Sequence, residues 1–116
     1  MPHFVIDCSE EIIKLRSPQE IIRKVYDATN ATELFIPEEI KVRINPYQFY
    51  TTGNTSDNFI HVFANIMEGR TTAQKAELSK QITTILNSMF PNVPIISINI
   101  RDFERATYCN KEMVLE

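Results

Sequence analysis

The apolar and polar positions of this chain follow the same order twice: a strand pattern, a helix pattern and a second strand pattern. In the first half, residues 3–8 are rich in apolar side chains and contain no glycine or proline, which predicts a strand. Ser17 and Glu20 have the spacing of a capping box and Pro18 stands at the first helical position, so we expect a helix to begin there. Residues 40–44 then alternate between apolar and charged, which predicts another strand.

Pro46 follows this run and limits where the strand can lie. Proline has no N–H to donate to a neighbouring strand, so within sheets it is confined to edges and bulges. We therefore expect the strand to bend, or to continue as an edge strand through Tyr47 to Tyr50.

The second half begins after a turn-rich join at residues 51–58. Residues 59–67 alternate in the manner of a strand. Thr71 and Gln74 repeat the capping-box spacing at the start of a helix with one apolar stripe. Residues 96–101 alternate again, so we expect a fourth strand there.

These elements predict an α+β fold, and the length of 116 residues predicts one domain spanning 1–116. Two consecutive βαβ units, at about 2–50 and 58–103, have right-handed crossovers and form a four-stranded sheet with both helices on one face. Residues 104–116 are expected to form a C-terminal arm or an extra strand. The sheet residues expected to lie under the helices are Ile40, Val42, Ile44, Ile60, Val62, Ala64, Ile66, Ile96, Ile98 and Ile100.

The opposite face of the predicted sheet is too polar for a core, yet it includes two phenylalanines. Such a face is typical of one that another subunit covers. We therefore expect a homo-oligomer. The residues assigned to this face are Lys41, Arg43, Phe59, His61, Phe63, Asn65, Ser97 and Asn99.

Composition narrows the possible partners. The formal net charge is −3, which gives no basic surface for nucleic acid. No apolar run approaches the roughly 18 residues of a membrane span, and the first residues have neither the charged region nor the apolar region of a signal peptide. We expect a cytoplasmic protein with no nucleic-acid and no membrane partner.

Cysteine, histidine and glycine are too sparse to build several common kinds of site. Cys8 and Cys109 lie at opposite ends of the chain, which favours two reduced, inert thiols. His3 and His61 are too isolated for a metal site. With two glycines, the chain has no glycine-rich phosphate loop and no nucleophile elbow.

Pro2 is the candidate catalytic residue, because it directly follows Met1. A methionine before so small a residue is normally removed during synthesis, and the proline nitrogen would then change from an amide into a secondary amine. α-Amino groups titrate at about 7.7–8.0, and burial or neighbouring cations lower that pKa. Pro2 would then be a free base near neutral pH, where acid–base catalysis works best. The alternative is that Pro2 has no catalytic role.

Three cations could bind an acidic group near such a base. Lys41 and Arg43 project from the same face of the second predicted strand, and Arg70 stands just before the helix start at Thr71, where backbone N–H groups can bind an anion. Arginine can also hold a carboxylate through two parallel hydrogen bonds. The alternative is that all three are solvated or form surface ion pairs.

Residues 2–9, Pro-His-Phe-Val-Ile-Asp-Cys-Ser, resemble the N-terminus of the 5-carboxymethyl-2-hydroxymuconate isomerase family, part of the tautomerase superfamily. Residues 40–43, 59–62 and 69–71 extend the resemblance, which covers 2–103 and is closely specific only at the N-terminus. It implies a trimer of double βαβ subunits that needs no cofactor.

The resemblance also implies roles for individual residues. Pro2 would be the general acid–base, and Arg70 would bind a substrate carboxylate. Lys41 stands where the family usually presents arginine, and Arg43 lies two residues further on, so either could supply the second cation.

We therefore expect an isomerase that moves a proton within a small, acidic, unsaturated keto or enol compound similar to 5-carboxymethyl-2-hydroxymuconate. Two alternatives stay open. The same site, with a protonated Pro2 and a bound water, could hydrate or dehalogenate an unsaturated acid. The protein could instead be a non-enzymatic trimeric binding protein. The natural substrate stays open as well, because its pocket depends on side chains from neighbouring subunits.

Overall fold

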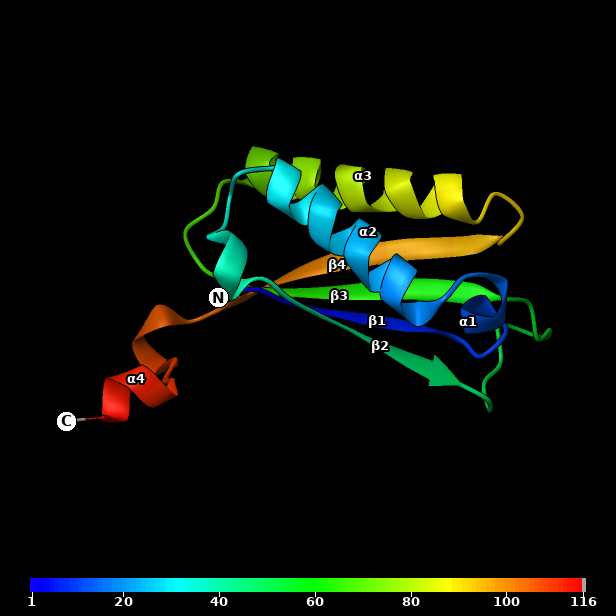
Figure 1. Cartoon of the computed structure of the whole chain (residues 1–116), viewed down its shortest axis with the longest axis horizontal. Helices are drawn as coiled ribbons and strands as arrows, with labels where there is room; N and C mark the ends of the chain where they lie inside the picture. The colour runs from blue at the N-terminus through cyan, green and yellow to red at the C-terminus, as the bar shows by residue number, and fades with distance from the viewer. Residues whose placement is uncertain (116) are drawn as a thin grey trace.

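The computed structural model describes residues 1–115 and has the expected α+β architecture. The strands are β1 (His3–Ser9), β2 (Lys41–Tyr47), β3 (Phe59–Met67) and β4 (Ile95–Phe103). The helices are α1 (Ile12–Leu15), α2 (Pro18–Ala31), α3 (Thr72–Met89) and α4 (Lys111–Val114), with 3₁₀ turns η1 (Pro37–Glu39) and η2 (Arg105–Thr107). The sheet order is β2-β1-β3-β4, with β1 parallel to β2, β1 antiparallel to β3, and β3 parallel to β4. Both long helices cover one face of the sheet (Figure 1).

The two long helices begin where their capping residues predict, but only one capping box is complete. Thr71 Oγ1 accepts from the Gln74 N–H at 3.1 Å, and Gln74 Oε1 accepts from the Thr71 N–H at 2.9 Å. Ser17 Oγ accepts from the Glu20 N–H at 3.2 Å. The Glu20 carboxylate instead pairs with Arg16 at 2.8 Å, so a neighbouring cation replaces the reciprocal half of the predicted box.

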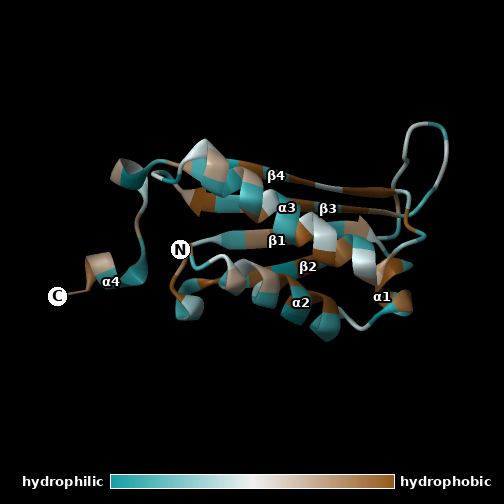
Figure 2. Ribbon diagram, turned by 90° about the horizontal axis from the view of Figure 1, so that it is seen from above, coloured by the Kyte–Doolittle hydropathy of each residue, from teal (hydrophilic) through white to brown (hydrophobic). Residues whose placement is uncertain are grey.

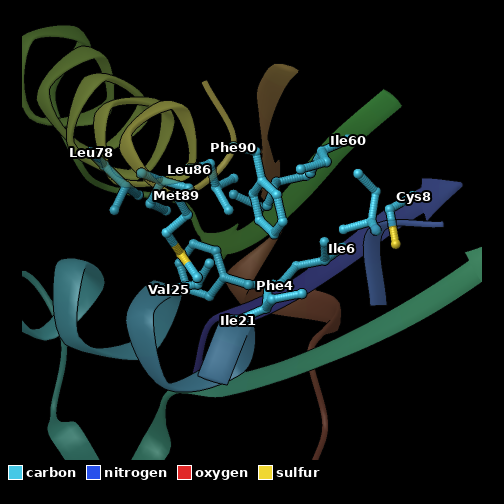
Figure 3. Close-up of a cluster of buried hydrophobic side chains, with 14 of the residues drawn as sticks. Phe4, Ile6, Cys8, Ile21, Val25, Ile60, Leu78, Leu86, Met89 and Phe90 are labelled. Carbon is cyan, nitrogen blue, oxygen red and sulfur yellow. The ribbon is translucent and has the colours of Figure 1, made fainter. Parts of the chain in front are cut away.

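The hydrophobic core lies between the sheet and helices α2 and α3 (Figure 3). Phe4 and Ile6 on β1 are fully buried, and the Phe4 ring meets Phe35 edge-on with 6.2 Å between centroids. Because β1 is an inner strand, its buried side chains hold the N-terminus firmly in the sheet. The ten residues expected under the helices all belong to this core: Ile40, Ile60, Val62, Ala64 and Ile66 are buried, and Val42, Ile44, Ile96, Ile98 and Ile100 are partly buried.

Strand β2 is the edge strand that Pro46 predicts. It pairs only with β1, where Pro46 lies opposite Cys8. The strand ends at Tyr47 and does not continue to Tyr50. The polar join that follows projects beyond the sheet (Figure 2).

Residues 104–115 form an arm and contain no strand, so of the two expected forms the structure has the arm. The arm leaves the end of β4 and extends away from the sheet (Figure 1). The radius of gyration is 15.2 Å, whereas a compact chain of this length has about 13 Å. Glu116, the last residue of the predicted arm, lies outside the described residues. Among the helices of residues 1–115, none has both the length and the apolar character that a membrane span requires.

Candidate active site at the N-terminal end of the sheet

The topology gathers segments that are far apart in the sequence at one end of the sheet. His3 is opposite both Lys41 on β2 and Asn65 on β3, and Met67 is opposite Phe103 on β4. Strands β1 and β2 therefore begin where β3 and β4 end. Figure 1 and Figure 2 show the N-terminus at the end of the sheet from which the arm leaves.

Pro2 occupies the first position of this end and is buried. Its carbonyl oxygen accepts a hydrogen bond from the Lys41 N–H at 3.1 Å, which continues the ladder between β1 and β2. Phe4, two residues further along β1, is buried in the core. Met1 precedes Pro2 in the structure, so the Pro2 nitrogen is here an amide.

The amine at this end is in surroundings that favour its neutral form. Burial is the largest cause that lowers the pKa of the Met1 amine from its ordinary value of 8.0. Glu39, 4.0 Å from the amine, raises the pKa, while Arg70, Lys41 and Arg105 lower it. An amine exposed at Pro2 would lie one residue further into the same surroundings.

Arg70 lies three residues after β3 and is held by contacts that the sequence does not suggest. Its Nη2 donates to the Leu34 carbonyl at 2.7 Å and its Nη1 to the Met67 carbonyl at 3.4 Å. The guanidinium also lies 4.7 Å from the centroid of the Phe35 ring. Arginine has five N–H donors, so these two hydrogen bonds leave others for a ligand. The helix cap is formed by Thr71 and Gln74 without Arg70, whereas Arg70 joins the α2–β2 connection to the end of β3.

Lys41 and Arg43 project from the same face of β2, as predicted, but only Lys41 is at the end that holds Met1. Lys41 Nζ donates to the Glu39 carbonyl at 3.0 Å. Arg43 lies opposite Val5, further from the N-terminus, and its Nη1 donates to His3 Nδ1 at 3.2 Å. Burial, and then Arg43, lowers the pKa of His3. The structure therefore brings Pro2, Lys41 and Arg70 to one end and leaves Arg43 further along the strand.

Arg105 is a further cation at this end of the sheet, and it was not predicted from the sequence. It stands in the arm, where the sequence has no periodic pattern that would place a side chain on the face of a strand or helix. A signal was nevertheless present: Arg105 follows the fourth strand as Arg70 follows the third. Because β3 and β4 are parallel neighbours, residues just after them must lie near one another.

Arg70 and Arg105 both line a hollow of about 370 Å³ at this end of the molecule. Glu33, Glu68 and Gln74 also line it, whereas Pro2 does not. Within a single subunit, the candidate base and the hollow between the two arginines are therefore adjacent features and not one enclosed cavity.

The cysteines are free, as expected. Cys8 is buried in the core, and burial, followed by the nearby Asp7, raises the pKa of its thiol to about 12. That thiol is neutral at physiological pH and is no nucleophile. Cys109 is exposed on the arm.

Comparisons with known proteins identify the family of the chain and agree with its fold. The chain matches the 5-carboxymethyl-2-hydroxymuconate isomerase family over residues 2–113. A search of curated proteins finds no significant match.

Three solved structures illustrate the shared fold. A 5-carboxymethyl-2-hydroxymuconate isomerase from Deinococcus radiodurans R1 has a TM-score of 0.83 at 23% identity, over 95% of this chain and 88% of that one. A 5-carboxymethyl-2-hydroxymuconate delta-isomerase has a TM-score of 0.77 at 17% identity, over 96% and 87% of the two chains. An asymmetric trimer of fused 4-OT has a TM-score of 0.73 at 15% identity, over 94% and 92%. Since the family match spans nearly the whole chain and the fold agrees with it, this chain belongs to the 5-carboxymethyl-2-hydroxymuconate isomerase family of the tautomerase superfamily and is an isomerase.

Proposed function

We propose that this protein is a cofactor-independent tautomerase whose base is the amine of Pro2, exposed when Met1 is removed. Its substrate is a small, acidic, unsaturated keto or enol compound of the 5-carboxymethyl-2-hydroxymuconate type. The observation that carries the proposal is the buried position of Pro2 at the end of the sheet where Arg70 and Lys41 also lie. A buried amine among cations is a free base near neutral pH, and the same cations attract an acidic substrate.

In this mechanism Pro2 transfers one proton within the substrate. The neutral amine takes the proton from the enol oxygen or an acidic carbon, which leaves a conjugated dienolate and a protonated amine. The amine then returns the proton to a conjugated carbon and is neutral again. No covalent bond to the protein forms, so no nucleophile is needed.

The cations hold the substrate and stabilise the charge that develops. Arg70 is held by two backbone carbonyls and the Phe35 ring, and in this mechanism it binds a carboxylate with its remaining N–H groups. Lys41 is the better candidate for the second cation, because it lies at the end of the sheet that holds Met1, whereas Arg43 lies opposite Val5 further along the strand. Fixed positive groups of this kind stabilise a dienolate without having to reorganise during the reaction.

Absorbance spectroscopy with a panel of 2-hydroxydienoates and phenylenolpyruvate tests this function. Protein shown by mass spectrometry to lack Met1 is expected to shift the ultraviolet spectrum of at least one compound without adding water to it. Absence of turnover across the panel would contradict the proposal. Products that have gained water, or released halide from a halogenated acid, would favour a hydratase or dehalogenase in its place.

We further propose that the active protein is a homotrimer built through the face of the sheet that the helices leave open. His61 on this face has hydrogen-bond distances of 2.6 Å from both Ser97 Oγ and Asn99 Oδ1. Its ring lies 4.6 Å from that of Phe63, over which Arg101 stacks at 5.1 Å. Polar groups already paired within the subunit, next to aromatic surface, form a face that another subunit can cover without leaving unsatisfied polar groups.

Sedimentation tests the assembly. The parent protein is expected to sediment as a trimer at micromolar concentration. Phe63→Asp should shift it toward monomer, because a charge would be buried on the covered face. Thr84→Asp places the same charge on the exposed side of α3 and is the matched control, expected to leave the trimer unchanged. A parent protein that stays monomeric at this concentration would contradict the trimer.

A further inference from the structure

We propose that Arg105 is a further specificity-determining residue of the site and holds the substrate carboxylate that lies furthest from Pro2. This inference rests on the proposed function for the location of the site beside Pro2 and Arg70. It assigns a role to a residue of the arm, which follows the last strand of the sheet.

Arg105 is fixed beside the segment that carries Arg70. The Glu68 N–H donates to the Phe103 carbonyl at 3.0 Å, which extends the pairing of β3 and β4 by one step. The Arg105 N–H in turn donates to Glu68 Oε2 at 2.7 Å. Arg105 is thereby tied to a residue only two positions before Arg70.

The turn that presents Arg105 is stabilised by its own contacts. The Tyr108 N–H lies within hydrogen-bond distance of the Glu104 and Arg105 carbonyls, at 3.2 and 3.3 Å. The Tyr108 ring stacks on Phe103, the last residue of β4, with 5.2 Å between centroids. The 3₁₀ turn η2 is therefore anchored to the sheet, although the arm beyond it extends away.

The two arginines complement each other at the hollow that they share. Arg70 is partly committed to the Leu34 and Met67 carbonyls. The Arg105 side chain is exposed, and within residues 1–115 its guanidinium forms no hydrogen bond or ion pair. Arg105 is therefore available for a group that Arg70 does not already hold.

The acidic side chains at the hollow narrow the kind of anion that fits. Glu33 and Glu68 line it together with the two arginines, so its formal charge is balanced. An anion must therefore be held by directed hydrogen bonds and not by net charge. A planar carboxylate, which matches the two parallel N–H groups of a guanidinium, fits this requirement better than a small spherical ion.

A second observation links Arg105 to the reacting end. Arg70 and Arg105 both lower the pKa of the N-terminal amine. Both positive charges therefore act at the point where the proposed base lies. A diene acid that extends from Pro2 toward the hollow would meet Arg70 and Arg105 in turn.

Equilibrium binding of two matched compounds tests Arg105 without relying on turnover. trans,trans-Muconate carries a carboxylate at each end of a diene, whereas sorbate has the same diene with one carboxylate and a methyl group. Neither has an enol to isomerise. The parent protein, lacking Met1, is expected to bind muconate more tightly than sorbate by calorimetry. Arg105→Gln should weaken muconate binding on the order of 10- to 100-fold, as loss of a charged hydrogen-bonding partner does, and change sorbate binding by less than about twofold.

Two further variants complete the test. Arg105→Lys should recover part of the muconate affinity, because lysine keeps the charge but not the two parallel donors. Lys111→Gln removes one positive charge from the same arm and should leave both affinities unchanged.

The proposal is overturned if the parent shows no preference for muconate, or if Arg105→Gln weakens both compounds equally or neither. Turnover on the 2-hydroxydienoate panel reports separately on the tautomerase. Muconate selectivity through Arg105 without turnover would support this inference and reject the proposed function. Turnover without muconate selectivity would support the proposed function and reject this inference.

Discussion

Protein that retains Met1 is expected to isomerise its substrate about 10²–10⁴-fold more slowly than protein that begins at Pro2, the range that a general acid–base group contributes. The reason is chemical. While Met1 is attached, the Pro2 nitrogen belongs to an amide and cannot accept a proton, although Pro2 stays buried at the same end of the sheet. Turnover of the two forms, separated and identified by mass spectrometry, measures the difference.

Pro2→Ala is the matched control for this comparison. Once Met1 is removed, alanine leaves a primary amine at the same place, so partial activity should remain with an altered pKa. The protein that retains Met1 and the protein that begins at Pro2 should have the same sedimentation and similar thermal stability. Equal turnover with and without Met1 would remove Pro2 from the mechanism.

The pH dependence of kcat/KM is a second test of the Pro2 amine as the base. A base is active when neutral, so kcat/KM should rise with pH through the pKa of the Pro2 amine. Burial and the cations lower the pKa of the amine at this end, so the rise should lie at a lower pH than the one at which an N-terminal proline titrates in the unfolded chain. Arg105→Gln removes a cation and should move the rise to higher pH. Glu39→Gln removes the carboxylate that raises the pKa and should move it to lower pH.

Most of the fold could be predicted, because particular residues and patterns restrict where each strand and helix can lie. Strict alternation over residues 59–67 determines β3, whose bounds agree with the pattern. Pro46 restricts β2 to an edge. The Ser17 box could not be predicted in full, because Arg16 competes for the Glu20 carboxylate and sequence spacing does not rank such competitors. The arm could not be predicted in detail either, since two short turns leave no periodicity.

The site was predictable where local chemistry is distinctive and not where it depends on register. Pro2 and Arg70 stand out by their places in the sequence. The distinction between Lys41 and Arg43 requires the pairing of β2 with β1, which places Arg43 opposite Val5. The Leu34 carbonyl that holds Arg70 comes from the α2–β2 connection and the Met67 carbonyl from the end of β3, and spacing along the chain cannot show that they meet.

Arg70→Ala is expected to lower kcat/KM by about 30-fold to several thousand-fold. Removing one partner of a desolvated charge pair costs about 2–5 kcal/mol, and about 1.4 kcal/mol corresponds to tenfold. Arg70→Lys should recover only part of the loss, because lysine cannot form two parallel hydrogen bonds with a carboxylate. Steady-state kinetics on the substrate identified by the absorbance panel measures both effects.

The contacts of Arg70 also predict a stability effect, which has to be separated from the loss of activity. Arg70→Ala removes hydrogen bonds to the Leu34 and Met67 carbonyls, each worth about 0.5–1.5 kcal/mol, so the free energy of unfolding should fall by roughly 1–3 kcal/mol. Thr71→Ala is the matched control: it removes the neighbouring helix cap, worth about 1 kcal/mol, and leaves the guanidinium in place. Thr71→Ala should therefore lower thermal stability while keeping kcat/KM within about fivefold of the parent at temperatures where it is folded. Two outcomes would show that Arg70 supports the fold and does not bind substrate. In the first, Arg70→Ala assembles normally and keeps kcat/KM within about fivefold of the parent. In the second, Thr71→Ala loses as much activity as Arg70→Ala.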